Sequence, residues 1–227
     1  METSTTSFIV EALTRSIVEH RLQPGTKLAE QKLADHFGVS RTLVRQALFQ
    51  MTQNRLVTLE PARGAFVATP SVSEARQVFA VRRMLECETV RAFAPTATAA
   101  QIKALRTHMA REQAAMDHRD VSRRTTLLGD FHVRMAELMG NQVLAQMLDE
   151  LISRCALITV MYQSTTAAAH SHEEHALIVD ALAAHDTETA VRLMREHLEH
   201  VEEGLCFDRK HPVSDLSFAL TSSATAP

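Results

Sequence analysis

The sequence predicts a mainly α-helical protein made of a small N-terminal unit and a larger helical bundle. Glycine is scarce, with six among 227 residues. After residue 70 the chain is dominated by Ala, Leu, Met, Glu and Arg, which favour helices over strands. The stretch ATPSVS, residues 68–73, is a Pro- and Ser-rich break near the middle. We therefore predict one unit over residues 1–70, a second over 71–207, and a flexible tail over 208–227.

The N-terminal unit is predicted to begin with helices. Apolar side chains recur at helical spacing over residues 8–20, FIVEALTRSIVEH, and the pattern breaks at Pro24-Gly25. A second helical pattern, within LAEQKLADHFG, stops at Gly38, because glycine adopts the positive φ of a helix end without steric cost. Two residues later, Ser40 can cap a further helix.

The helix after Ser40 is amphipathic. Val44, Leu48 and Met51 share its apolar face, and Arg45 lies on the opposite face. The period then changes, because VTLE and AFVA, separated by residues 61–64, read as two short strands of a hairpin. A helix, a tight turn, an amphipathic helix and a hairpin together predict a winged helix-turn-helix.

This arrangement suits double-stranded DNA. Arg41 and Arg45 can reach phosphates or the O6/N7 edge of guanine, and the helix N-terminus offers amide donors to phosphate. Arg63 and Gly64 at the hairpin tip are expected to enter the minor groove, since glycine permits close backbone approach. Residues 1–70 hold eight Lys and Arg against six Asp and Glu, whereas the remainder holds 16 against 21. A solvated helix with ordinary arginines is the alternative, and the order of elements favours DNA.

Residues 22–67 resemble the DNA-binding domain of the GntR family of bacterial transcription regulators. The matching features are Pro24-Gly25, Leu28, Glu30, Leu33-Ala34, Gly38, Ser40-Arg41-Thr42, Arg45, Ala47-Leu48 and Arg63-Gly64. Two positions depart from the family pattern, because Leu43 stands where proline is common and Gln46 where glutamate is common.

The resemblance implies which side chains meet the operator. By this likeness, Arg41, Thr42, Arg45 and the wing residue Gly64 contact DNA. Gln31 lies at a position that reads a base or phosphate in some members of the family.

Residues 72–205 are predicted to form a bundle of about six or seven helices. Thr98 and Gln101 make a capping-box pattern at the start of the second helix, and Ser171 and Glu174 make another at the start of the fifth. Asp186 is placed to cap the sixth. The cysteines, Cys87, Cys155 and Cys206, lie far apart in apolar contexts, so we expect reduced core residues and no disulfide.

Three of the twelve histidines lie within apolar helical stripes: His132, His175 and His197. All three should point inward. Neutral imidazoles that converge from three helices suit zinc, nickel and related ions. The alternative is that each is a hydrogen-bonded core residue, since the sequence does not show that they converge.

The segments FHVRMAELMGN, EHALIVDAL and DTETAVRLMREHL are similar to the FCD ligand-sensing domain of the FadR-type branch of this family. Many such domains bind a metal through one Asp and three His, and the resemblance implies His132, His175 and His197 as ligands. Leu128 stands where the Asp is common. A water, the effector or another side chain must then complete the ligand shell, or the metal is weakly bound or absent.

Arg82, in VRRMLE, matches a position that tends to face the pocket in this branch, where its guanidinium would bind a carboxylate effector. The alternative is an ion pair with Glu86, four residues later on the helix. Arg134 and Arg154, on the third and fourth helices, are further effector-binding candidates. We therefore expect a small organic acid as effector.

The predicted function is a homodimeric transcription regulator, most often a repressor, that binds a palindromic operator. The rival interpretation is a metal-dependent enzyme that uses the three histidines, and no acid or base candidate accompanies them. The string HEEH at 172–175 is not the HExxH motif of zinc proteases, because its histidines are three residues apart. The sequence has neither an 18-residue apolar run nor a signal-peptide pattern, so we expect a cytoplasmic protein without a membrane partner.

Overall fold

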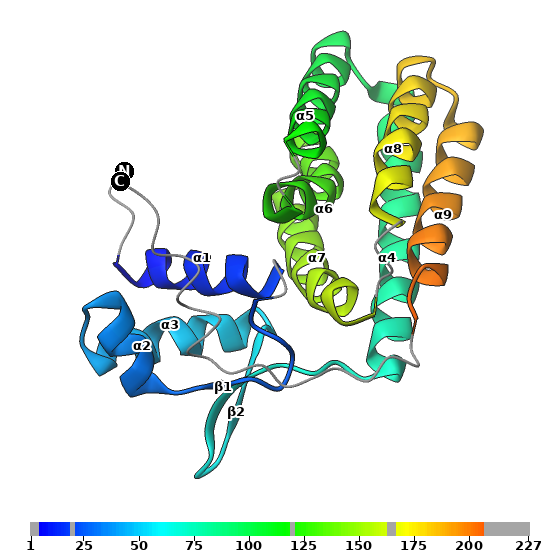
Figure 1. Ribbon diagram of the computed structural model, residues 1–227. Coiled ribbons are helices and arrows are strands. Elements are labelled where there is room, and N and C mark those ends of the chain that lie inside the picture. The colour runs from blue at the N-terminus through cyan, green and yellow to red at the C-terminus, as the bar shows by residue number, and fades with distance from the viewer. Residues whose placement is uncertain (1–4, 19–20, 119–120, 163–166, 207–227) are drawn as a thin grey trace. The chain divides into compact units, whose positions relative to one another are not determined.

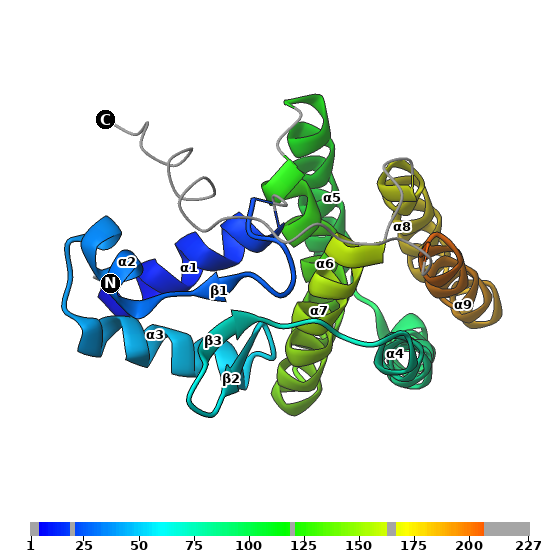
Figure 2. The ribbon, with the colours of Figure 1, turned by 60° about the horizontal axis from the view of Figure 1, so that its bottom comes forward.

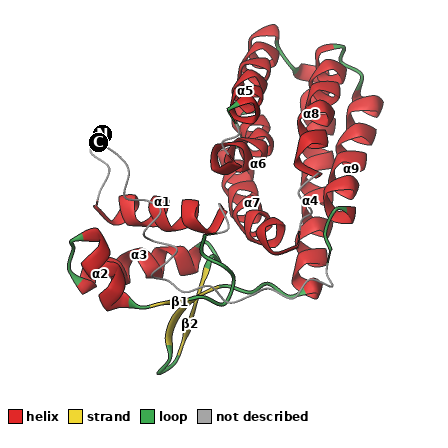
Figure 3. Cartoon of the chain, in the orientation of Figure 1, coloured by secondary structure: helices red, strands yellow, loops and turns green. Residues whose placement is uncertain are grey.

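The computed structural model describes residues 5–18, 21–118, 121–162 and 167–206 of the chain (Figure 1). They divide into two compact units, the first ending at Pro70 and the second beginning at Ser71. Helices dominate both units, and three short strands accompany the first (Figure 3). The mainly α-helical class is confirmed. The tail predicted over 208–227 lies outside the described residues.

The first unit is a winged helix-turn-helix. Its elements in order are α1 (Thr5–Val18), β1 (Lys27–Leu28), α2 (Glu30–Phe37), α3 (Arg41–Gln53), β2 (Val57–Glu60) and β3 (Gly64–Val67). Helix α1 packs along α3, as Figure 2 also shows. The strands form an antiparallel sheet in the order β1-β3-β2, in which Leu28 pairs with Ala65 and Leu59 with Ala65 on the other side. The sequence pattern does not reveal β1, because two residues are too few to show alternation.

Local signals in the sequence explain the ends of α2 and α3. Gly38 adopts φ 64°, the left-handed conformation that ends α2. The Ser40 hydroxyl accepts a hydrogen bond from the Leu43 amide, so Ser40 caps α3 as predicted. Leu13 of α1 and Val44 and Leu48 of α3 are almost fully buried, and they hold the two helices together.

The second unit is an all-helical bundle. Its elements are α4 (Val72–Phe93), a 3-10 turn (Ala94–Thr96), α5 (Ala99–Asp117), α6 (Val121–Leu138), α7 (Gln142–Tyr162), α8 (Ala167–Ala183) and α9 (Thr187–Glu203). Helix α4 packs on α9, α5 on both α6 and α8, α6 on α7, and α8 on α9. Phe93, Phe131 and Met194 anchor a core that α4, α5, α6, α8 and α9 share.

The predicted caps of this unit divide into two that hold and one that fails. Thr98 and Gln101 form the reciprocal capping box, and the Asp186 side chain accepts from the Thr189 amide. The capping box at Ser171 is wrong, because α8 already begins at Ala167 and Ser171 lies inside the helix. A short polar run resembles a helix start whether or not the helix extends upstream of it.

Two further expectations are settled by burial and length. Cys87 and Cys155 are buried, as predicted. Cys206 is exposed, so the prediction that it is a core residue is wrong. None of the described helices is both long enough and apolar enough to cross a bilayer.

Candidate functional site

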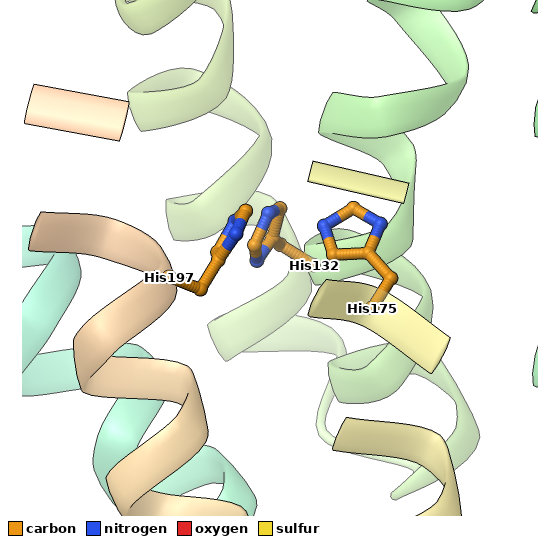
Figure 4. A group of neighbouring side chains, drawn as sticks. All are labelled: His132, His175 and His197. Atoms are coloured by element: carbon orange, nitrogen blue, oxygen red, sulfur yellow. The ribbon is translucent and has the colours of Figure 1, made fainter. Parts of the chain in front are cut away.

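His132 of α6, His175 of α8 and His197 of α9 converge inside the helical bundle (Figure 4). One ring nitrogen of each lies within 4.8 Å of the others. All three side chains are buried, and His175 is completely inaccessible. The structure therefore brings together the histidines that the apolar stripes place on the inner faces of their helices.

Packing around His132 and His175 holds their rings in place. The Phe131 ring stacks on the His175 ring with centroids 3.9 Å apart. Gly129 lets α6 lie close to α7, because a Cβ atom at this position would be 2.5 Å from Cγ2 of Ile152. Both contacts fix α6 at the depth where His132 meets the other two histidines.

Burial keeps all three imidazoles neutral. Desolvation lowers the pKa of His132, His175 and His197 from 6.5 to about 4. At neutral pH each ring therefore has one nitrogen with a free lone pair. That is the form in which histidine binds a metal ion.

Each histidine has a carboxylate behind it, supplied by another helix. The three contacts are His132 Nδ1 to Glu86 Oε2 at 2.5 Å, His175 Nδ1 to Glu112 Oε1 at 3.2 Å, and His197 Nδ1 to Glu174 Oε2 at 2.6 Å. The first is a close polar contact whose geometry does not meet hydrogen-bond criteria. An ionised carboxylate only accepts hydrogen bonds, so Nδ1 of His175 and His197 must carry the proton. Their Nε2 atoms are then the unprotonated ones.

Glu112 of α5 contacts more than one histidine. It is fully buried and also contacts His108 Nε2 and, at 2.9 Å, His172 Nδ1. Burial raises its pKa, but the hydrogen bonds from His108 and His175 outweigh burial and lower the pKa to about 2. Glu112 therefore stays ionised at every pH where the protein is expected to fold.

Two residues behind the histidines stand out, His172 and Glu112. From its place in HEEH, the sequence favours a solvated helix-start position for His172, with a substitute metal ligand as the alternative. The residue instead lies within α8 and is mostly buried against Glu112. The sequence did offer a signal for Glu112, because it continues the buried stripe of Leu105 and His108 on α5. A charged residue in such a stripe requires buried partners.

Arg82 pairs with Glu86 and also faces the cavity beside the histidines. Its Nε donates to Glu86 Oε1 at 2.7 Å, and its Nη1 donates to Cys155 Sγ at 3.1 Å. Arg82 and Glu86 are buried, so this i,i+4 pair is not a surface salt bridge. Burial raises the pKa of Glu86, but the charge of Arg82 and the contact with His132 hold it well below its usual value. Arg82 also lines the cavity described next.

A cavity of about 80 Å³ adjoins the three histidines. Arg82, Cys155, Thr125, Thr159 and Ser171 are among its polar lining residues, and Leu128, Ile152 and Val201 are among its apolar ones. Leu128 therefore faces the site, as the family Asp would. Arg134 and Arg154 do not line the cavity, and Arg134 instead pairs with Glu137 at 2.7 Å on an exposed part of α6.

The donor set fits a divalent metal. The Nε2 atom of His175 is buried and has no hydrogen-bond partner among the described residues, as expected of an atom that coordinates a metal ion. Three neutral imidazoles with an open position are a set that zinc accepts. No carboxylate of the described residues joins this group, because the glutamates contact the histidines from behind.

The predicted DNA-reading residues lie on the winged unit. Arg41, Thr42 and Arg45 are exposed on α3, and Glu30 of α2 pairs with both arginines. Gln31 is also exposed, and its amide donates to Asp35 at 2.8 Å.

At the wing, Gly64 adopts φ 101°, a conformation that a side chain rarely permits. The Arg63 guanidinium lies 5.1 Å from the centre of the Phe66 ring, and the Lys27 ammonium lies 5.9 Å from it. Lys27 joins the wing through β1 and was not expected from the sequence.

Comparison with known proteins explains both units. Residues 5–67 match the model of bacterial regulatory proteins of the gntR family, and residues 77–200 match the FCD domain. The chain belongs to the GntR family. It is a DNA-binding transcriptional regulator with an effector-binding FCD domain, and the comparisons give the enzyme interpretation no support.

This GntR-family chain is similar to several known regulators over most of its length. The transcriptional repressor RspR of Escherichia coli K12 is 26% identical over 200 residues, which is 87% of each chain. The regulator BphR of Paraburkholderia xenovorans is 29% identical, over 83% of this chain and 80% of the relative. The crystal structure of a GntR regulator from Rhodococcus sp. RHA1 is 25% identical, with TM-score 0.75, over 88% of this chain and 97% of that one.

The neutral histidines predict how stability depends on pH. Their pKa values are lower in the folded chain, so unfolding takes up protons between pH 6.5 and about 4. The free energy of unfolding should be greatest above pH 6.5 and fall as pH decreases to about 4. Each histidine contributes about 1.4 kcal/mol per pH unit within this window. The unfolding free energy is measured by denaturant titration in the presence of chelator at several pH values. Its change per pH unit should be smaller by about this amount in His175→Gln than in the wild type.

The matched control is His170→Gln, which alters an exposed histidine on the same helix. It should leave the slope unchanged. Parallel slopes for the wild type and His175→Gln would mean that His175 is not held neutral.

Proposed function

We propose that this regulator is a homodimer that represses transcription from a palindromic operator. A small organic acid, bound beside a divalent metal in the FCD domain, would release it from DNA. The observation that carries the proposal is the meeting of three neutral, buried histidines and Arg82 at one cavity of a chain that also has a winged helix-turn-helix. The names of relatives such as the repressors RspR and NanR support repression.

DNA reading is assigned to α3, its neighbour α2 and the wing. Arg41, Thr42 and Arg45 would contact base edges and phosphates from α3, with Gln31 beside them on α2. Arg63 and Gly64 would approach the minor groove, where the bare backbone of glycine fits. Exposure of these α2 and α3 side chains supports the assignment.

Pairing of two chains is supported by an apolar surface on the FCD domain. Val81 and Met84 of α4 and Val143 and Met147 of α7 are exposed, although α4 and α7 pack against each other. Large apolar residues that are exposed on two helices packed against each other are typical of an interaction surface. A second copy is its natural occupant, because a palindromic operator needs two reading heads. We expect two chains on each operator duplex.

Replacing Arg45 tests the base contact. If its guanidinium forms paired hydrogen bonds with a guanine, Arg45→Ala should weaken operator binding about 5- to 150-fold and relax the base preference at one position of each half-site. The measurement is a titration of an operator duplex selected from a random library, with the mass of the complex recorded to count chains. Arg15→Ala removes an exposed arginine of α1 as a control and should leave the base preference unchanged. An unaltered preference in Arg45→Ala would remove Arg45 from base reading.

His132, His175 and His197 would hold the metal, with Glu86, Glu112 and Glu174 orienting them. The metal would act as a Lewis acid that binds an oxygen of the effector. Leu128 cannot ligate, so water or the effector itself would complete the shell. The carboxylates would fix each ring so that its free nitrogen faces the ion.

Metal content tests this assignment. Purified His175→Ala should contain less zinc or nickel than the wild type while keeping its helical circular dichroism. Glu112→Gln should keep the ligands but bind the metal about 10- to 100-fold more weakly, because it loses the charge that orients His175. Competition with a chromogenic chelator measures both. His170→Ala is the control, and equal metal in His175→Ala and the wild type would exclude His175 as a ligand.

The cavity argues for a small effector. Its volume of about 80 Å³ corresponds to a few water-sized positions at about 10–15 Å³ each. Arg82 offers the positive charge for a carboxylate, but Glu86 and Cys155 already occupy part of its fork. The acid would therefore share Arg82 with Glu86 or displace it. Arg82 and Glu86 both lie on α4, which follows β3 in the chain. Effector binding would therefore act on the helix nearest in sequence to the wing.

A thermal-shift screen of small carboxylic and sugar acids tests the effector class, with added zinc or nickel and again after chelation. Ligand at 100 times its Kd should stabilise the chain by about 2.7 kcal/mol and raise the Tm by several degrees. A shift that disappears on chelation supports an effector bound through the metal. A shift that survives chelation supports an Arg82-centred site without metal, and no shift in either condition contradicts the organic-acid class.

A further inference from the structure

Glu30 is an acidic residue that pairs with two arginines of the proposed DNA-reading helix α3. It opens α2, and its carboxylate bridges two residues of α3 that lie one turn apart. Nε of Arg45 lies 2.9 Å from Oε1 and 2.8 Å from Oε2, and Nη2 of Arg41 lies 3.1 Å from Oε2. A polyanionic partner would repel this carboxylate, so its position requires a reason.

The hydrogen bonds of Glu30 leave a particular edge of Arg45 free. Both carboxylate oxygens face Nε, so the terminal Nη1 and Nη2 groups take no part in these bonds. Those two terminal nitrogens can form the paired hydrogen bonds to O6 and N7 of guanine. Arg45 is also well exposed, so without this contact its long side chain would sample many rotamers.

The charge of Glu30 persists under binding conditions. Its hydrogen bond from Arg45 lowers its pKa and outweighs the effect of partial burial, with a further contribution from Arg41. An ionised carboxylate weakens the attraction between the protein and DNA phosphates, whatever the base sequence. By contrast, its orientation of Arg45 strengthens binding only where a guanine accepts the two hydrogen bonds of the guanidinium. The two effects act together to widen the difference between operator and random DNA.

We propose that Glu30 is a positioning residue that determines the specificity of DNA reading, by holding Arg45 ready for guanine and by penalising non-specific contacts with phosphate. This inference rests on the proposed contact between Arg45 and a guanine. It predicts that specificity, rather than affinity alone, depends on an acidic side chain that lies among the arginines.

The test uses the full-length variant Glu30→Gln, which keeps the size of the side chain and removes its charge. The matched control is Glu11→Gln, which removes one charge from an exposed position of α1 in the same unit. Each protein is titrated with the selected operator and with a scrambled duplex at two salt concentrations. For Glu30→Gln we expect the ratio of the two affinities to fall about tenfold or more, with weaker operator binding and scrambled binding equal to or tighter than wild type.

Glu11→Gln should change both affinities by the same factor and leave the ratio as in the wild type. A merely structural role of Glu30 would lower both affinities together, so an unchanged ratio in Glu30→Gln overturns the proposal. Arg45→Ala, measured in parallel, distinguishes failure of the proposed Glu30 role from failure of the proposed guanine contact. If Arg45→Ala lowers the ratio and Glu30→Gln does not, only the role of Glu30 fails. If neither lowers it, the guanine contact fails and the role of Glu30 fails with it.

Discussion

The contact between a buried imidazole and a carboxylate of another helix is the interaction on which the effector-binding domain depends. A carboxylate removed from water is costly unless it is paired, and each of Glu86, Glu112 and Glu174 meets a histidine of another helix. These contacts join α4 to α6, α5 to α8, and α8 to α9. The same contacts that compensate the buried charges therefore orient the three histidines and connect five of the six helices in this unit.

Arg82 extends this network from the histidines to the cavity. It lies between Glu86, which contacts His132, and Cys155 on the wall of the cavity. Any acid that competes for Arg82 changes the surroundings of Glu86, and hence those of one candidate metal ligand. If metal and effector bind as proposed, they would be coupled through this side chain, and by linkage each would change the affinity for the other by the same factor.

Two of the glutamates that pair with arginines, Glu86 and Glu30, lie in different settings. Glu86 pairs with Arg82 in the interior, where loss of one partner would leave an uncompensated charge. Glu30 pairs with exposed arginines, where an ion pair adds little stability because water screens it. Under the role proposed for Glu30, the second pair would contribute orientation and specificity rather than stability.

Local sequence alone determined the helical class, the glycine that ends α2, the caps at Ser40, Thr98 and Asp186, and the inward faces of the three histidines, because helix ends and amphipathic faces depend on neighbours along the chain. The tertiary structure decided what those faces meet. The pairing of β1 with the wing, the depth of Glu112 and His172, the position of Arg134 away from the cavity and the bridge from Glu30 to two arginines all join residues distant in the sequence. Such contacts depend on how helices pack, and periodicity within one helix carries no information about the partner across from it.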